Sequence, residues 1–119
     1  MNIETFREYC LSKKGVTEEF PFDEHTLVFK VMGKMFALSG LERLPMQVNL
    51  KCDPERAIQL REEYDGAIFA GYHMSKVHWN TIILEQVPTK LIAELIDHSY
   101  ALVVSKFTKK LKAELENLE

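Results

Sequence analysis

Residues 46–64, MQVNLKCDPERAIQLREEY, join the most regular strand pattern of the chain to its best-marked helix. Apolar and polar residues alternate over 46–51, as in a strand with one buried and one exposed face. The inward positions are Met46, Val48 and Leu50, and the outward positions are Gln47, Asn49 and Lys51. This stretch therefore predicts a sheet whose outer face carries polar side chains.

The helix predicted over 53–64 has a strong start signal. Asp53 is a good N-cap residue, Pro54 fits the first helical position, and Glu55 suits the positive end of the helix dipole. Gly66 then ends the helix. A strand followed directly by a capped helix is the local unit from which the rest of the fold is built.

More strands are predicted on both sides of this unit. TLVFKV (26–31) alternates, MGK (32–34) predicts a turn, and MFALSG (35–40) pairs back to complete a hairpin. WNTIIL (79–84) is a further strand, and the irregular stretch 67–78 has room for a short one. Strands joined by hairpins form an antiparallel sheet.

Two helices complete the pattern. Apolar residues recur at helical spacing over 2–14 and over 88–107, and a helical tail follows at 108–119. VTEEFPFDEH (16–25) is predicted to be an extended acidic connection. We predict an α+β fold, a two-layer α/β sandwich with an antiparallel sheet, helices on one face and an open polar face on the other.

Size and composition suit a single domain, residues 1–119. Hydrophobic residues make up 46% of the chain, enough for a core, and charged residues 28%. No apolar run approaches the ~18 residues that span a bilayer, and MNIETFREYC at the N-terminus lacks a signal-peptide pattern. With only two isolated cysteines, Cys10 and Cys52, we expect a cytoplasmic monomer without a membrane partner.

Three stretches resemble a known family: GVTEEFPFDEHTLVFKVMGKMFAL (15–38), VNLKCDPERAIQLREEYDGAIFAGYHMSKVHWNTI (48–82) and LIDHSYALVVSKF (95–107). Together they are similar to the MmcQ/YjbR family of small bacterial proteins, over about residues 3–107. The most specific parts are NLKCDPE and GYHMSKVHWN. The resemblance implies a fold similar to bacterial frataxin, an α–β–α sandwich with an antiparallel sheet. It also implies DNA binding through a double-wing arrangement.

Reactive side chains are densest in GYHMSKVHWN (71–80). Ser75 lies near His73 and His78, but no nucleophile motif surrounds it, and the chain has no glycine-rich phosphate loop or paired-carboxylate motif. Two histidines five residues apart lack the paired spacing of zinc sites. We therefore expect a protein that is not an enzyme, with no catalytic residue, no bound metal and no cofactor.

Charge is segregated along the chain, although the net charge is only −3. Residues 26–51 hold four basic and one acidic side chain, and residues 66–84 hold one basic and no acidic side chain. These two segments are therefore net +4, and the rest of the chain is net −7. Lysines on the sheet layer would suit phosphates, but lysine on an exposed strand also protects a sheet against edge aggregation.

These patterns favour a binding protein. DNA is the leading partner, and an acidic protein surface or a small anionic ligand is the alternative. Trp79 is expected to anchor its strand in the core, with Asn80 facing the opposite way. The candidate binding residues on the sheet face and the 71–80 loop are Lys30, Lys34, Arg43, Asn49, Lys51, His73, Lys76, His78 and Asn80.

Overall fold

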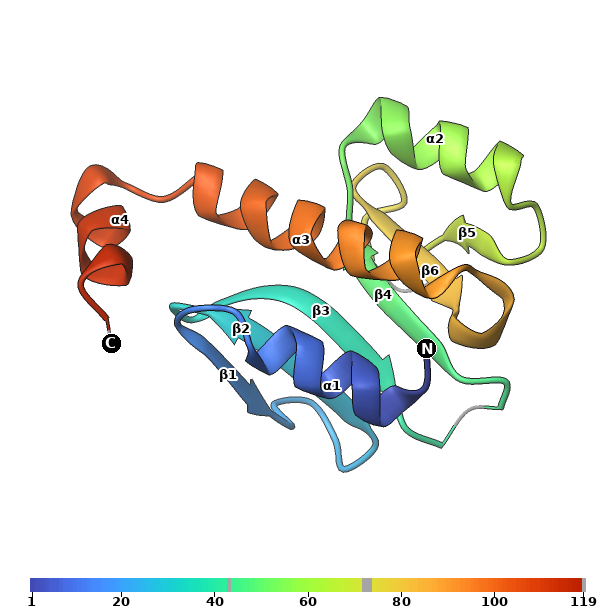
Figure 1. The fold of residues 1–119 in the computed structure, drawn as a ribbon, viewed down its shortest axis with the longest axis horizontal. Coiled ribbons are helices and arrows are strands. Elements are labelled where there is room, and N and C mark those ends of the chain that lie inside the picture. The colour runs from blue at the N-terminus through green and yellow to red at the C-terminus, as the bar shows by residue number, and fades with distance from the viewer. Residues whose placement is uncertain (43, 72–73, 119) are drawn as a thin grey trace.

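The fold is that of a computed structural model and is described for residues 1–42, 44–71 and 74–118. Two of the expected binding residues, Arg43 and His73, lie outside the described residues. The helices are α1 (Ile3–Leu11), α2 (Pro54–Glu63), α3 (Thr89–Ser105) and α4 (Lys109–Glu116), with a 3-10 turn η1 (Leu84–Gln86). The strands are β1 (Val16–Glu19), β2 (Thr26–Val31), β3 (Lys34–Gly40), β4 (Gln47–Lys51), β5 (Ile68–Ala70) and β6 (Trp79–Ile83) (Figure 1).

The described strands form one six-stranded sheet in the order β1-β2-β3-β4-β6-β5, with antiparallel pairing throughout. β2 and β3 are joined by a two-residue turn in which Met32 and Gly33 both have positive φ, 49° and 84°. Such turns match the twist of a hairpin, and glycine at the second position removes most of the strain. The hairpin predicted from 26–40 is therefore confirmed.

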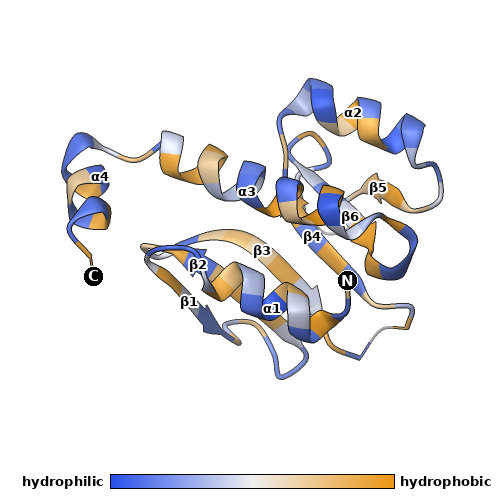
Figure 2. Ribbon diagram, in the orientation of Figure 1, coloured by the Kyte–Doolittle hydropathy of each residue, from blue (hydrophilic) through white to orange (hydrophobic). Residues whose placement is uncertain are grey.

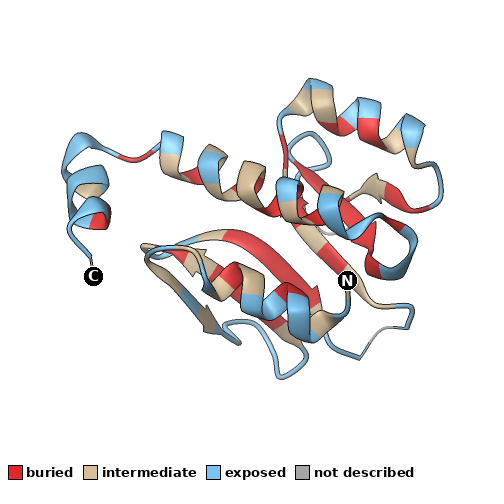
Figure 3. Ribbon diagram, in the orientation of Figure 1, coloured by how far each residue is buried: buried red, intermediate tan, exposed pale blue. Residues whose placement is uncertain are grey.

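The helices pack on one face of the sheet (Figure 1). One core cluster contains Phe6 of α1, Leu60 of α2 and Ile96 of α3 together with Val48 and Ile82 of the sheet. Hydrophobic residues (Figure 2) and buried residues (Figure 3) concentrate along the central strands and on the helix turns that face them. The α+β sandwich with helices on one face is thus confirmed, and the helices add one layer to the sheet.

Long helix α3 crosses the sheet and is fixed to it by Ser99. The Ser99 hydroxyl donates to the carbonyl oxygen of Phe36 at 2.6 Å and accepts from the backbone N–H of Lys51 at 2.9 Å. One buried hydroxyl therefore joins α3 to β3 and β4. In the described residues, no helix is long and apolar enough to cross a membrane.

One local prediction was wrong. The acidic connection 16–25 begins with a real strand, β1, whose Glu18 and Glu19 pair with Phe29 and Val28 of β2. The helical tail predicted at 108–119 is present as a separate helix, α4, which Thr108 caps by accepting from the backbone N–H of Leu111. Leu115 of α4 is buried and belongs to the main core cluster, so the tail is packed on the domain.

Candidate ligand-binding face

The open face of the sheet displays alternate residues of the same strands that build the core. Cross-strand register places these residues in three rows. The lower row contains Thr26, Gly40 and Gln47. The middle row contains Val28, Leu38, Asn49, Thr81 and Phe69. The lysine row pairs Lys30 with Met35 and Lys51 with Trp79.

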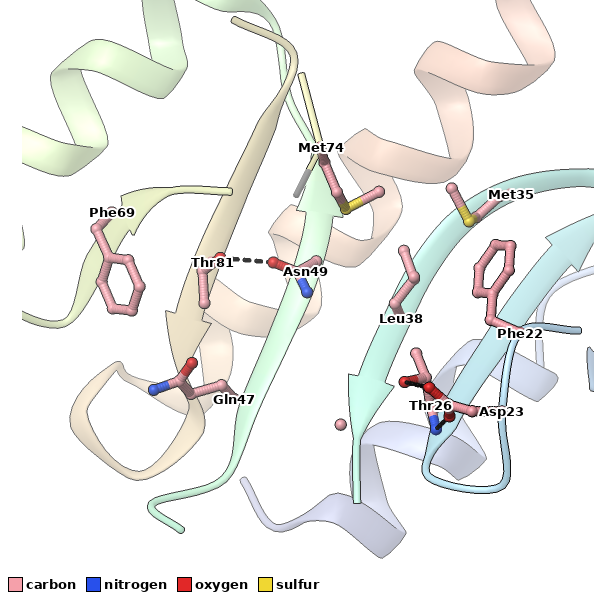
Figure 4. A pocket seen from close by; sticks show the side chains of 11 residues that line it. Phe22, Asp23, Thr26, Met35, Leu38, Gln47, Asn49, Phe69, Met74 and Thr81 are labelled. Carbon is pink, nitrogen blue, oxygen red and sulfur yellow. Dashed lines mark hydrogen bonds between the residues drawn. The ribbon is translucent and has the colours of Figure 1, made fainter. Parts of the chain in front are cut away.

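A groove of about 500 Å³ lies over the lower and middle rows. Figure 4 shows Phe69 at one end, Phe22 at the other, and Asn49 between them. This volume falls within the range of known small-molecule sites. The residues lining it are Phe22, Asp23, Thr26, Met35, Leu38, Gly40, Gln47, Asn49, Phe69, Met74 and Thr81.

The groove floor has a polar centre. The Thr81 hydroxyl donates to Asn49 Oδ1 at 2.5 Å, and the Asn49 amide nitrogen points away from Thr81 (Figure 4). Gln47 lies two residues earlier on the same strand and the same face. Because the hydroxyl occupies the amide oxygen, Asn49 presents N–H donors to whatever enters the groove.

Gly40 keeps the groove open at the lower row. A Cβ built on this residue would meet no atom within 4 Å, so the space above it is free. Glycine inside a strand weakens it and often marks a place where another molecule approaches. The missing side chain at Gly40 therefore leaves the open face of the sheet accessible to a ligand.

A small apolar cluster borders the groove, and its members Leu38, Met35 and Met74 line it. Val28, Leu38 and Trp79 are buried together, with Met35 and Met74 packed against them. This cluster is separate from the main core, because it lies on the open side of the sheet. The open face is therefore less polar than the alternation of 46–51 predicts. Trp79 is buried as expected, but on the open side.

Asn80 is the clear correction among the candidate residues. It faces the helix layer, is only 2% exposed, accepts from Arg61 Nε at 2.7 Å and donates to the carbonyl oxygen of Ala57 at 3.4 Å. The prediction that Asn80 is one of the binding residues was wrong. It failed because an arginine from α2 satisfies the buried amide.

Arg61 also holds the turn beside the groove. Its Nη2 donates to the carbonyl oxygen of Lys76, while the backbone N–H of Cys52 donates to the carbonyl oxygen of His78 at 2.8 Å. These contacts fix the segment that carries Met74 on the groove and Lys76 and His78 on the exposed surface. The Arg61 guanidinium lies on the helix side of the sheet and thus holds in place the turn that borders the groove.

The lysines gather at one end of the sheet. Lys51 of the lysine row ends β4, and Lys76 precedes β6 at the same end of the sheet. Lys34 follows the β2–β3 turn at this end, but it pairs with the core residue Val31, so its side chain lies on the helix side. Lys30 is ion-paired with Glu19 of β1. Within the described part of the chain, Lys34, Lys51 and Lys76 form no ion pair with a carboxylate. The surface therefore keeps positive charge at this end.

The opposite rim is acidic. Asp23 accepts from the backbone N–H groups of His25 at 2.8 Å and Thr26 at 2.7 Å. These hydrogen bonds, that of His25 first, hold the pKa of the Asp23 carboxyl below its ordinary value. His25 in turn pairs with Glu42, 2.9 Å away. The two long sides of the groove thus differ in charge.

The described histidines are dispersed. His78 is exposed at the turn, His25 lies at the acidic rim, and His98 of α3 accepts from the backbone N–H of Asp53. Burial lowers the pKa of His98, with a further lowering by Arg56. Among residues 1–42, 44–71 and 74–118, no three His, Cys, Asp or Glu side chains gather as a metal site would require.

Both cysteines are free and buried. Burial raises the pKa of the Cys52 thiol to about 11 and that of Cys10 higher still. A thiolate is the reactive form, so raised pKa values make both thiols unreactive. Both are packed in the main core cluster.

Sequence reasoning found part of this face. It identified the outward Asn49 and Lys51 but missed Gly40, Thr81 and Phe69, which complete the groove. A glycine at the end of an alternating strand was an available signal for Gly40. The positions of the other two depend on the strand order β4-β6-β5.

Comparisons with known proteins agree with this architecture. The YjbR family model matches residues 11–102. The chain is 35% identical to the Escherichia coli O157:H7 protein YbdF over 108 residues, covering 90% of this chain and 88% of that one. It is 30% identical to YjbR of Escherichia coli K12, covering 99% of this chain and all of that one.

Solved structures give the same result. The crystal structure of the Deinococcus radiodurans protein DR2400 has a TM-score of 0.91 at 41% identity, covering 97% of this chain and 88% of that one. A Pseudomonas syringae protein has a TM-score of 0.73 at 29% identity, covering 86% of this chain and 98% of that one. The arrangement of helices and strands is therefore similar in both.

Proposed function

The chain belongs to the YjbR family, and we propose that it is a non-enzymatic binding protein that holds an anionic ligand on its open sheet face. The groove of about 500 Å³ beside the lysine row is the observation that carries this proposal. Largely apolar walls with a few convergent polar groups are typical of ligand sites. The scatter of the described histidines supports binding rather than catalysis.

The charges and the shape of the open face indicate how the ligand is oriented on it. Its apolar body lies over Leu38 and the flanking Met35 and Met74. A hydrogen-bond acceptor meets the amide nitrogen of Asn49. Its anionic group lies toward Lys51 and the lysine end of the sheet. Asp23 on the acidic rim disfavours the reverse orientation.

The test is a panel of nucleoside monophosphates, aromatic carboxylates and phosphorylated sugars, screened by thermal shift and by NMR on labelled protein. At least one class should raise the melting temperature and shift the resonances of Asn49 and Thr81. Gly40→Ile should remove that binding, because its side chain enters the groove. Binding that survives Gly40→Ile, or no response from the panel at the groove, would overturn the proposal.

The matched control is Thr17→Ile. Thr17 is exposed and pairs with Lys30, so it lies on the same face but outside the groove lining. Both variants place an isoleucine side chain on a strand of the open face. Loss of binding in Gly40→Ile with retention in Thr17→Ile separates groove filling from a general change in the sheet.

Duplex DNA is a second candidate, favoured by the grouping of Lys34, Lys51 and Lys76 at one end of the sheet. Cations that contact phosphates make affinity fall with salt, by about 0.9 log units per log unit of salt for each contact. Lys51→Ala with Lys76→Ala should reduce that slope by about two. Exposed Lys109 and Lys110 of α4 provide the control pair. A slope unchanged by the first pair excludes duplex binding at this end.

A further inference from the structure

The groove is long. It reaches from Phe69 on β5 to Thr26 on β2, with Phe22 beyond. Four strand spacings separate β5 from β2 in the sheet order, which corresponds to about 19 Å. A compact ligand would fill only part of this length, so the shape favours an elongated one.

The two long sides of the groove are chemically unequal. The lysine row, with Lys30 and Lys51, runs across the strands parallel to the groove. Asp23 lies on the other side with its carboxyl held by backbone N–H groups. Lys30 forms an ion pair with Glu19. Because Glu19 is exposed, another anion can take its place beside the Lys30 ammonium. An elongated ligand with charge along one edge would lie with that edge on the lysine row.

The ends and floor of the groove suit flat rings with polar edges. Phe22 is 67% exposed and Phe69 is half-buried, so each offers part of a ring face to a ligand. Between them lies the Asn49 amide, with Gln47 on the same strand. Aromatic side chains stack on unpaired bases, and Asn or Gln amides bond to base edges.

We propose that the groove binds single-stranded nucleic acid, which lies across the strands with its phosphates on the lysine row and its bases in the groove. This inference rests on the proposed function and names the ligand class for that same site. Bases stack on Phe22 and Phe69, and Asn49 donates to the edge of a base between them. In a duplex the bases are paired and stacked inside the helix, so no base is available to enter the groove.

Fluorescence anisotropy tests the proposal with a labelled single-stranded DNA of about eight nucleotides at 50 mM salt. The same sequence as a duplex and free nucleoside monophosphates form the comparison arms. Single-stranded DNA should bind at least tenfold more tightly than the duplex. Phe22→Ala and Phe69→Ala should each weaken binding about tenfold. Lys30→Ala with Lys51→Ala should flatten the salt dependence.

Phe20 provides the matched control. It belongs to the same connection as Phe22, is 48% exposed, and does not line the groove. Phe20→Ala should therefore leave affinity within twofold of the wild type. Each variant is checked by its thermal melt, and the exposure of Phe22 makes a folding defect in Phe22→Ala unexpected.

The alternative outcomes are separable. A duplex that binds as tightly as the single strand, with Phe22→Ala and Phe69→Ala unaffected, overturns the single-strand proposal in favour of a lysine surface for duplex DNA. Monophosphates that bind at Asn49 while the single strand does not compete also overturn it, although the proposed ligand groove stands. If Gly40→Ile binds every probe as the wild type does, the proposal that the groove is the binding site is refuted.

Discussion

The two faces of the sheet are built from alternate residues of the same strands, yet they have different compositions. On β2, Phe29 faces the helices and is fully buried, whereas Thr26 and Lys30 face outward. On β4, Val48 is buried in the core while Asn49 lines the groove. The covered face is filled with large apolar groups, and the open face combines one small apolar cluster with amides, lysines and a glycine. The core and the proposed binding site therefore use alternate positions along the same strands.

The largest expected effect is on the covered face. Phe29 is fully buried, and its ring meets Phe6 edge-on with the ring centres 5.9 Å apart. Phe29→Ala should lower the free energy of unfolding by about 3–5 kcal/mol, because it leaves a cavity in the core. Urea denaturation measures this. Phe22→Ala on the open side should change stability by no more than about 0.5 kcal/mol, and equal losses would break the distinction between the faces.

Arg61 connects the two faces, so its removal should have an intermediate effect. Arg61→Ala leaves the buried Asn80 amide and the Lys76 carbonyl without their donor. The expected loss is about 1–3 kcal/mol, with faster amide hydrogen exchange at residues 76–78. Arg56→Ala is the control, because Arg56 pairs with the more exposed Glu94 and should cost about 0.2–1 kcal/mol. Unchanged exchange at the turn would show that Arg61 does not position it.

The polar pair on the groove floor should matter little for stability. Replacing Asn49 and Thr81 together, as Asn49→Leu with Thr81→Val, removes both members of one hydrogen bond and leaves no partner unsatisfied. Unfolding free energy should change by less than about 1 kcal/mol, whereas ligand binding at the groove should be lost. A large destabilisation with intact binding would assign these residues to the structure instead.

The smallest expected effect is a pH dependence on the covered side. Burial lowers the pKa of His98 in the folded state relative to the unfolded chain. Below the ordinary histidine pKa of about 6.5, the unfolded state therefore binds more protons, so stability falls as pH falls. Above that value the contribution of His98 is fully present. Urea denaturation from pH 7.5 to 5 should show a shallower decline for His98→Gln than for the wild type, with equal slopes above pH 7.5.

Most of the scaffold is predictable from the sequence, because it rests on local periodicity. The alternation over 46–51 and the Asp53 cap appear as predicted, and Asp53 Oδ2 accepts from the backbone N–H of Arg56. β1 was missed because Val16 is its only apolar residue, and an edge strand needs little burial. An edge strand such as β1 forms because its backbone pairs with the neighbouring strand β2, and its own side chains give little sequence signal.

The candidate binding face is less predictable, because it depends on strand order. Asn49 and Thr81 are 32 positions apart in the chain and meet only because β4 pairs with β6. The sequence predicts that Asn80 faces outward, but its amide faces the helix layer and accepts from Arg61 of α2. Lys34, Lys51 and Lys76 were identified from charge alone, but their grouping at one end of the sheet required the register.

The chemistry of the two native cysteines offers a practical consequence. Cys10 and Cys52 are the only thiols in the chain, and burial with raised pKa values protects both from alkylation. A thiol introduced by Gly40→Cys would stand in open space and react alone with a maleimide dye. The wild-type background thus needs no cysteine removal before an environment-sensitive fluorophore is installed in the groove. Its emission would report occupancy of the open face in real time.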